Sequence, residues 1–467
     1  MQAVGVESTT DHHALTPSTP LRTLPQRWPY RPLFFCVRLP MSSAPPDLDL
    51  PFQYHRLANG LRVVLHRNAA LPLVAVNLWY HVGSKNERPG RTGFAHLFEH
   101  MLFQGSEHVG THDHFRLLQQ VGGVANGSTW YDRTNYYETL PSHQLDLGLW
   151  LESDRMGFFL PALTQENLDT QRDVVMNERR QRIENQPYGL AGERLHELLY
   201  PADHPYHWPV IGYMDDIAAA TLEEVQAFFR TYYTPSNAVL TLAGDFDPEA
   251  ALDRVEAWFG NIPAGPPVPP VIVPAAKPAG ERREVLPDAV RLPRIYIGFR
   301  APAYGDRAWY AADMLSAVLT GGKSSPLYRD LVYDRQIAQD VGASVSPYEK
   351  GGTFMMVATA RPGVEVETLE KAMLDHIAAA ATTLPDRDEL ERARNRMLTD
   401  TYSSLQKLDG VADLFSQFAT YFDDPGGVAA EAGRYLQIEP EEMMELAAAY
   451  LTENERVVLQ VVPRDAE

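Results

Sequence analysis

Three side chains that can bind a metal or transfer a proton lie within residues 96–100, which read H-L-F-E-H: His96, Glu99 and His100. In a helix, His96 and His100 are one turn apart on the same face, so both imidazoles can reach one ion. Glu99 lies at the edge of that face, where its carboxylate could hold a water molecule beside the metal. The flanking residues are almost all apolar, which is typical of a buried helix, and His and Glu are costly to bury without partners. The pattern H-x-x-E-H, the reverse of the common H-E-x-x-H motif, therefore predicts a zinc site if a third ligand exists elsewhere.

A catalytic zinc ion usually has three protein ligands and one open position. The best candidate for the third ligand is Glu178, in the segment V-V-M-N-E-R-R of a helix expected over residues 164–185. Glu178 follows Val174 by four residues and Val175 by three, so it shares the partly apolar face that should pack inward. The alternative is a surface glutamate paired with Arg182 one turn later. Sequence spacing alone leaves both interpretations open.

The elements that must position these residues follow from periodicity, turn residues and helix caps. In the first part of the chain we expect strands at residues 52–57, 61–66, 73–82, 124–131, 134–140 and 238–243, and helices at 94–105, 111–120, 142–158, 164–185, 222–233 and 248–259. In the second part we expect strands at 294–300, 338–346, 353–360 and 456–462, and helices at 306–320, at 324–334 and between 361 and about 450. The first two strands should form a hairpin at Asn59-Gly60, and Thr111 and Thr164 are the expected N-caps of their helices.

The two parts of the chain are related to each other. Residues 221–232 followed by 238–242 are echoed at an offset of 218 by residues 439–450 followed by 457–459, and residues 93–105 are echoed at an offset of 217 by 310–322. A nearly constant offset over separate elements indicates a duplicated α+β domain, each copy a mostly antiparallel sheet packed with helices. The second copy has other residues at the motif positions: Asp313 for His96, Ser316 for Glu99 and Ala317 for His100. Only the first copy can therefore bind the metal.

This duplication predicts two homologous domains, at residues 51–260 and 283–467. Residues 261–282 hold seven prolines and few large apolar side chains, so they are the expected linker. Residues 1–50 are rich in Pro, Thr and Ser without periodicity, which predicts a disordered tail or a mis-assigned start, with Met41 as the true first residue.

Composition excludes several classes of function. The net charge of −20 argues against nucleic acid or an anionic membrane surface as the main partner. The single cysteine, Cys36, excludes an intramolecular disulfide and a cysteine-based zinc site. No run approaches the ~18 apolar residues of a membrane span, and the apolar stretch 32–40 is short and broken by Arg38. A cytoplasmic location is the expectation, with a periplasmic one as the alternative.

The motif at 96–100, the segment around Glu178 centred 78 residues after His100, and the duplicated α+β architecture resemble the pitrilysin family. This superfamily of inverted-motif zinc peptidases includes insulin-degrading enzyme and the mitochondrial processing peptidase. The resemblance covers roughly residues 52–463 and is closest to the bacterial members built as half-length chains. It implies that His96, His100 and Glu178 bind one zinc ion per chain and that Glu99 is the general base.

The resemblance also concerns substrate binding. It implies that residues 124–130 form an edge strand on which a peptide substrate is laid, with Asn126, Gly127 and Ser128 as its contacts. Such strand addition depends on main-chain hydrogen bonds and has little sequence preference. An ordinary sheet strand is the alternative. Nearby, His108, His112 and His114 are expected to be solvated and to bind no metal.

Three positions depart from the family pattern. Gln171 replaces a second glutamate two turns before the third ligand, so an auxiliary role of that carboxylate is in doubt. Val332 and Gln339 stand where the family has an arginine and a tyrosine that reach the active site from the second half. The expected partner is therefore a homologous chain without the zinc motif, in a heterodimer, with a homodimer as the alternative.

The predicted function is a zinc endopeptidase acting on peptides or unfolded segments. A non-catalytic scaffold or assembly subunit of the same fold is the rival from another class. A peptidase dedicated to maturing a peptide-derived cofactor is the third hypothesis.

Overall fold

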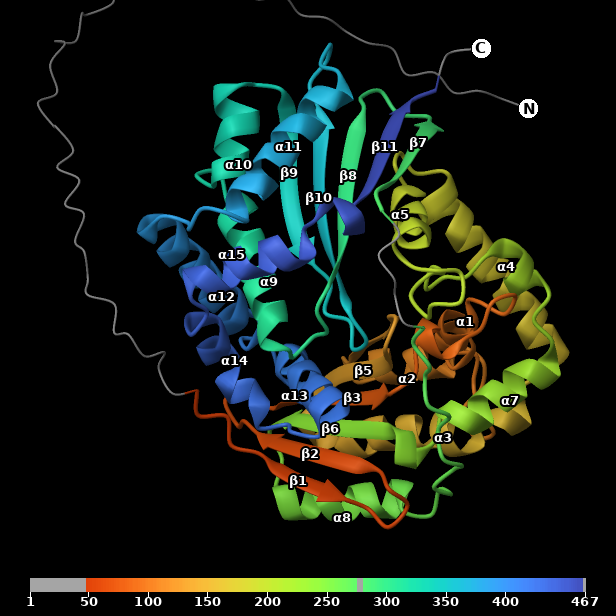
Figure 1. Ribbon diagram of the computed structural model, residues 1–467. Coiled ribbons are helices and arrows are strands. Elements are labelled where there is room, and N and C mark those ends of the chain that lie inside the picture. Colours follow the sequence, from red (N-terminus) through yellow and green to blue (C-terminus); the bar gives the residue numbers. More distant parts are fainter. Residues whose placement is uncertain (1–47, 275–279, 465–467) are drawn as a thin grey trace, which may run out of the picture. The chain divides into compact units, whose positions relative to one another are not determined.

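Two β-sheets organise the chain in the computed structural model, which describes residues 48–274 and 280–464 (Figure 1). The strands of the first sheet are β1 (Gln53–Arg56), β2 (Arg62–Arg67), β3 (Leu73–Tyr80), β4 (Val124–Thr129), β5 (Thr134–Pro141) and β6 (Ala238–Gly244). Those of the second are β7 (Arg282–Asp288), β8 (Arg294–Ala301), β9 (Ala338–Val345), β10 (Gly352–Ala360) and β11 (Val457–Pro463). All neighbours are antiparallel except β2 with β6 and β7 with β11. The predicted α+β class with mostly antiparallel sheets is confirmed.

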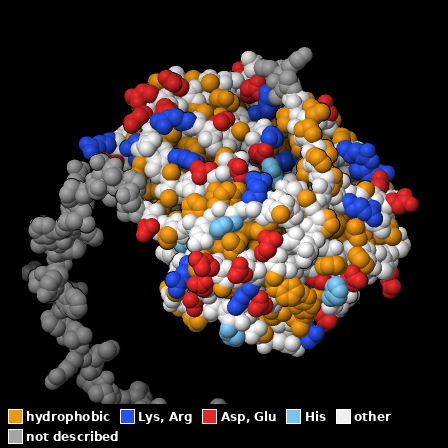
Figure 2. Space-filling view, turned by 90° about the horizontal axis from the view of Figure 1, so that it is seen from below, with side chains coloured by type: hydrophobic (Ala, Val, Ile, Leu, Met, Phe, Trp, Pro, Cys, Tyr) orange, Lys and Arg blue, Asp and Glu red, His pale blue; other side chains and the backbone are white. Residues whose placement is uncertain are grey.

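Helices pack on both faces of the two sheets. The first half contains α1 (Phe94–Met101), α2 (Asp113–Gln120), α3 (Leu145–Ala162), α4 (Gln165–Arg179), α5 (Ala191–Leu199), α6 (Met214–Ala218), α7 (Leu222–Tyr232) and α8 (Pro248–Phe259). The second half contains α9 (Arg307–Thr320), α10 (Pro326–Tyr328), α11 (Val366–Ala380), α12 (Arg387–Ser404), α13 (Leu408–Phe422), α14 (Gly427–Leu436) and α15 (Pro440–Tyr450). On the face in Figure 2, acidic and basic side chains are interspersed, so the negative net charge does not form one patch there.

The sheet topology repeats. The strand order is β1-β2-β6-β3-β5-β4 in the first sheet and β7-β11-β8-β10-β9 in the second. If β1 is left out, the two orders are the same: β2, β6, β3, β5 and β4 of the first sheet correspond to β7, β11, β8, β10 and β9 of the second. The predicted duplication is therefore visible in the topology. In both copies the first strand of the β4–β5 or β9–β10 pair lies at a sheet edge.

Each sheet is covered on one face by a helix from the other half. Helix α13 of the second half packs on β3 and β6 of the first sheet, where its buried Phe415 and Phe418 join Trp79 and Val239 in one apolar cluster. Helix α5 of the first half packs on β8 and β11, and a Cβ atom added at Gly298 would lie 3.0 Å from Leu195. The two helices start at residues 191 and 408, which differ by the same 217 positions as the sequence repeat. We call them the exchanged helices.

Several predicted boundaries were wrong. The first motif helix ends at Met101 rather than near Gly105, where φ is +102° and the chain turns. Helix α2 begins after His112, in left-handed conformation and with no side-chain cap, so Thr111 is not its N-cap. Helix α4 ends at Arg179 and continues as a π-helical turn over Arg180–Glu184.

Strand β7 and the helices α5 and α6 were not predicted from the sequence. Strand β7 was assigned to the end of the linker and the start of the second domain, because it is half-exposed and contains Pro287. A proline is tolerated there because β7 is an edge strand. Helix α5 is short, and its apolar face pairs with a sheet that lies about 100 residues later in the chain. Local periodicity carries no information about such a partner.

The described residues between Phe259 and Arg282 contain no helix or strand. We place the boundary between the halves, as a proposal, in residues 261–282. The predicted tail, residues 1–50, lies outside the described residues apart from 48–50. Among the described residues, no helix combines the length and apolarity needed to cross a bilayer.

Candidate metal site and active site

Helix α1 presents its two faces to different surroundings. Phe94, Leu97, Phe98 and Met101 are buried in the core of the first half, whereas His96, Glu99 and His100 line the cavity. The Glu87 carboxylate fixes the start of the helix by accepting hydrogen bonds from the backbone N–H groups of residues 93 and 95, both at 2.8 Å.

The three predicted ligands converge on one point. The Glu178 Oε2 atom lies 3.1 Å from His100 Nε2 and 3.9 Å from His96 Nε2. One potential ligand atom from each residue lies within 4.8 Å of the other two. The two imidazole rings are 4.8 Å apart and nearly perpendicular. Helices α1 and α4, 78 residues apart in sequence between His100 and Glu178, thus bring together the donor atoms of one site.

The protonation of these residues suits a metal. Burial, together with the neighbouring His100, lowers the pKa of His96 to about 4, so this imidazole is neutral at neutral pH and its nitrogen can donate a lone pair. A hydrogen bond from His100 lowers the pKa of Glu178, which keeps this carboxylate ionised. Two imidazoles and one carboxylate form a donor set that zinc accepts in catalytic sites. The residues present therefore fit a zinc ion.

Glu99 lies beside this donor set and not within it. Its Oε2 atom accepts a hydrogen bond of 2.7 Å from the hydroxyl of Thr129 on β4. Burial raises the pKa of Glu99, and the Thr129 hydrogen bond opposes that increase. Strand β4 can approach Glu99 because Gly127 has no side chain: a Cβ atom there would lie 3.1 Å from Glu99 Cγ. Among the described residues, the other carboxylate oxygen, Oε1, has no hydrogen-bond partner, and Glu99 is one of the residues that line the adjacent cavity.

These side chains line a cavity of about 550 Å³. Its lining comprises His96, Glu99, His100, Phe103, Gln104, Phe115, Asn126, Gly127, Ser128, Thr129, Gln171, Glu178 and Arg182. All three predicted substrate contacts are among them. They belong to β4, which among the described strands pairs only with β5 and is therefore an edge strand beside the cavity. The N–H of Gly127 donates to the Asn126 side chain, and the carbonyl of Ser128 accepts a hydrogen bond from Arg133. An extended peptide could add to this edge.

Comparison with protein families places both halves of the chain. Residues 62–206 match the family described as insulinase (peptidase family M16), and residues 219–397 match the peptidase M16 inactive domain. The chain belongs to peptidase family M16. The predicted resemblance to the pitrilysin and insulin-degrading enzyme superfamily is thereby confirmed, and so is the architecture of two M16-type domains.

Individual M16 relatives are similar over most of the chain. A Helicobacter pylori protein named zinc protease PqqE is 29% identical over 419 residues, which cover 87% of this chain and 92% of that protein. The crystal structure of a protease from Helicobacter pylori superposes with a TM-score of 0.84 at 28% identity, covering 89% of this chain and 100% of that one. The periplasmic protease PqqL from Escherichia coli shares the fold, with a TM-score of 0.72 at 18% identity, over 90% of this chain but 48% of that protein.

The departures from the M16 pattern have distinct locations. Gln171 is buried and lines the cavity with a neutral amide. Val332 is buried, whereas Gln339 is exposed at the start of β9. Neither Val332 nor Gln339 lines the cavity, whose described lining comes entirely from residues 96–182. In the second half, the Asp313 carboxylate accepts a hydrogen bond of 2.9 Å from Tyr435 instead of joining a metal-ligand group.

Several residues of the site were not predicted from the sequence. Phe103 and Phe115 stack at 4.7 Å and form one wall of the cavity. Thr129 follows Gly127 by two positions in β4, so the two share one face of the sheet. That spacing is the signal that could have identified Thr129. Arg182 was considered only as an alternative partner for Glu178, and the structure places it in the lining.

A second cluster of charged side chains is buried near the candidate site and contains His114. The prediction that His114 is solvated was therefore wrong. This histidine is buried, not solvated, and groups with the carboxylates of Glu138 and Glu152. Arg155 forms an ion pair with Glu152, and its Nη2 atom lies 3.5 Å from His114 Nε2. Both oxygens of Glu138 are buried without a hydrogen-bond donor among the described residues. Arg155 already neutralises one carboxylate, so Glu138 retains the only uncompensated negative charge of this cluster unless it binds a proton.

Glu138→Gln is expected to stabilise the protein at high pH. Burial, together with the Glu152 carboxylate, raises the pKa of Glu138 well above its ordinary range. The native state therefore holds this proton more tightly than the unfolded chain, and stability falls as pH rises above about 4.3, the ordinary pKa of glutamate. Glutamine is neutral at every pH, so the variant should gain about 1–3 kcal/mol in free energy of unfolding at pH 8 and little at pH 4.

Chemical denaturation at both pH values measures this difference. Glu445→Gln, at an exposed position in the middle of α15, is the matched control and should change stability at neither pH. Equal destabilisation by Glu138→Gln at pH 4 and pH 8 would mean that Glu138 is ionised in the native protein.

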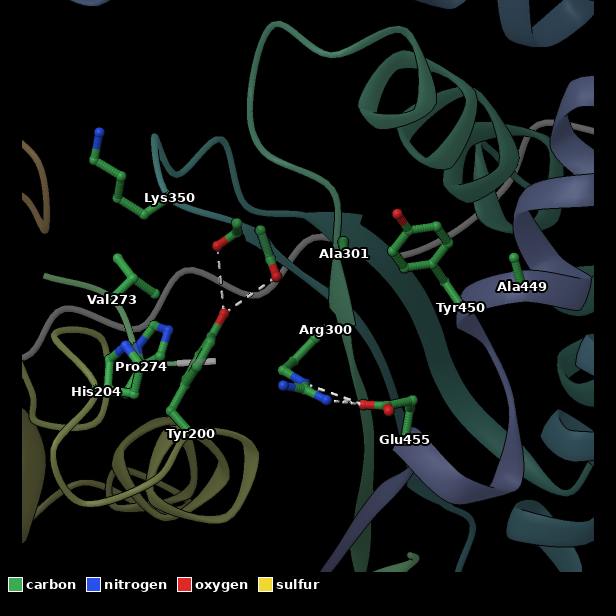
Figure 3. A pocket seen from close by; sticks show the side chains of 12 residues that line it. Tyr200, His204, Val273, Pro274, Arg300, Ala301, Lys350, Ala449, Tyr450 and Glu455 are labelled. Atoms are coloured by element: carbon green, nitrogen blue, oxygen red, sulfur yellow. Dashed lines mark hydrogen bonds and ion pairs between the residues drawn. The ribbon is translucent and has the colours of Figure 1, made fainter. Parts of the chain in front are cut away.

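Another cavity, of about 390 Å³, lies away from the candidate site (Figure 3). It lies between Tyr200 and His204 of the first half and the second sheet (Figure 3). Its charged side chains are paired: Arg300 donates to Glu455, and Lys350 lies 2.5 Å from Glu349. The metal-ligand groups found in the described residues both lie elsewhere. We therefore assign the chemistry to the cavity around His96.

Proposed function

We propose that this chain is a zinc-dependent endopeptidase that hydrolyses peptides or unfolded protein segments. The observation that carries the proposal is the convergence of His96 Nε2, His100 Nε2 and Glu178 Oε2 beside the Glu99 carboxylate. Membership of family M16 and the zinc protease names of similar proteins support it. No observation in the structure favours a scaffold role or a single cofactor-maturation substrate over general peptide hydrolysis.

His96, His100 and Glu178 would hold the zinc ion. When bound, zinc would supply a Lewis acid that polarises the scissile carbonyl and lowers the pKa of water. Glu99 takes the proton from the attacking water at Oε1, because Thr129 occupies Oε2. The same carboxylate then gives this proton to the leaving nitrogen. Strand β4 holds the peptide extended across the cavity, with Asn126, Gly127 and Ser128 as the nearest contacts.

Metal analysis of the purified protein tests this proposal. We expect about one zinc per chain, three residues being the usual protein ligand set of a catalytic site. Removal of zinc with a chelator should abolish hydrolysis of a peptide mixture, and added zinc should restore it. His100→Ala should lose zinc, whereas His108→Ala, whose ring is bonded to Asp154 outside the cluster, should retain it. Zinc-free protein that hydrolyses peptides at the full rate would refute the proposal.

We also propose that the active enzyme contains a second, homologous chain without the zinc motif. The cavity receives no described residue from the second half, and Val332 and Gln339 replace the polar pair of the family. The Escherichia coli protein PqqL, which this chain covers over 48% of its length, is about twice as long. A partner chain would supply the part that such longer proteins carry on one polypeptide. A homodimer is the alternative.

A further inference from the structure

The two oxygens of the Glu178 carboxylate have different partners. Oε2 faces the imidazoles, 3.1 Å from His100 Nε2, whereas Oε1 lies 2.6 Å from Arg182 Nη1. Arg182 follows Glu178 by four residues and belongs to the π-helical turn after α4. The ligand and surface-pair interpretations of Glu178 are thus compatible, because each uses a different oxygen.

We propose that Arg182 is the positioning residue of the metal site, which holds Glu178 in the orientation that binds zinc. This inference rests on the proposed function. A glutamate side chain has three rotatable bonds, and a side chain that must be ordered at the moment of binding lowers the affinity for the ligand. The Arg182 ion pair orders Glu178 beforehand, with Oε2 directed toward the two histidines. Groups that hold a metal ligand in this way commonly change metal affinity 10–100-fold when they are removed.

The surroundings explain why Arg182, and no other arginine of this turn, has this role. The last residue of α4 is Arg179, the turn after it contains Arg180 and Arg182, and the three side chains have different partners. Arg179 is buried and anchors the turn, with its Nη1 atom donating to the carbonyl of Gly212 at 3.0 Å. Arg180 donates to Asn177 on the exposed side of α4. Of these three arginines, Arg182 is the one that lines the cavity.

The effect on metal binding can be separated from an effect on folding. The Arg182 side chain is 77% exposed and Glu178 is 15% exposed. An exposed ion pair of this kind contributes little to the stability of the fold. Loss of Arg182 should therefore change zinc affinity without changing the denaturation midpoint, which a purely structural residue would shift.

Zinc titration in competition with a chromophoric chelator tests the inference. Arg182→Ala is expected to weaken zinc binding up to about 10-fold, the lower end of that range because the ion pair is largely exposed, with an unchanged denaturation curve. Arg182→Lys, which keeps the charge but not the planar fork, should fall between Arg182→Ala and the wild type. Arg180→Ala is the matched control and should bind zinc within about 2-fold of the wild type, as expected for an exposed pair outside the site.

The outcomes distinguish the two proposals. A wild-type chain that binds no zinc would refute the proposed function itself. A wild-type chain that binds zinc, together with Arg182→Ala of equal affinity to Arg180→Ala, would refute only the role of Arg182. If Arg182→Ala is destabilised and Arg182→Lys has wild-type affinity and stability, Arg182 is structural, and the inference is also refuted.

Discussion

Glu99→Gln is expected to lower kcat/KM for peptide hydrolysis by about 10²–10⁴, the usual contribution of a general base. Glutamine has nearly the same shape and can still accept the Thr129 hydrogen bond, but it cannot take a proton from water. The zinc content should be unchanged, because Glu99 lies beside the donor set and is not one of its three residues. Steady-state kinetics on a quenched fluorescent peptide, with metal analysis of the same samples, measures both quantities.

Glu107→Gln is the control for this experiment. Glu107 is an exposed glutamate seven residues after His100, and its backbone N–H binds the carbonyl of Phe158 outside the cavity. It should have wild-type kinetics and zinc content. If Glu99→Gln retains more than about a tenth of the activity, Glu99 is not the general base, since general-base catalysis contributes at least 10².

The second large effect is expected from a partner chain. Hydrolysis generates an oxyanion, and a donor directed at that charge is worth about 10²–10³ in rate. The cavity of this chain offers zinc ligands and Glu99, but Val332 and Gln339 provide neither the arginine nor the tyrosine of the family. We expect kcat/KM to rise about 10²–10³-fold when the chain is co-expressed and purified with a zinc-less homologue that has this pair.

Two controls identify the source of that activity. The complex formed with the Glu99→Gln chain should be inactive, because the zinc site of this chain performs the reaction. A homologue in which the arginine and tyrosine are replaced should bind but give no gain. An increase in the specific activity of this chain alone with its own concentration would instead favour the homodimer. Full activity from the lone monomer would exclude both assemblies.

The part of the site that depends on local sequence could be predicted. His96 and His100 are one helical turn apart, and their spacing holds whatever α1 packs against. Glu178 was a candidate because it shares the partly apolar face of α4 with Val174 and Val175. The sequence could not decide whether Glu178 is a metal ligand or the partner of a surface arginine, because that depends on which side chains lie beside each of its carboxylate oxygens. In the structure one oxygen faces His100 and the other Arg182.

The parts that depend on distant partners could not be predicted. His114 was expected in solvent because it begins a short polar helix, yet it is buried beside Arg155 from α3. Its burial depends on charges that are 24 to 41 residues away in sequence, at Glu138, Glu152 and Arg155. Strand β7 and helix α5 were missed for the same reason, because each is stabilised by elements of the second half.

The exchanged helices have a consequence for how such a chain arises and stays together. Helix α5 packs its apolar face on the second sheet, and α13 packs its apolar face on the first. Each half therefore contributes a helix to the hydrophobic core of the other. This is the arrangement of a domain-swapped dimer, in which two identical chains trade one element. A duplicated gene that encoded such a dimer as one polypeptide would give the 217-residue spacing of α5 and α13. Residues 261–282 would then covalently join two halves that already associate through their packing. Cleavage by a protease within this segment should therefore leave the two fragments associated.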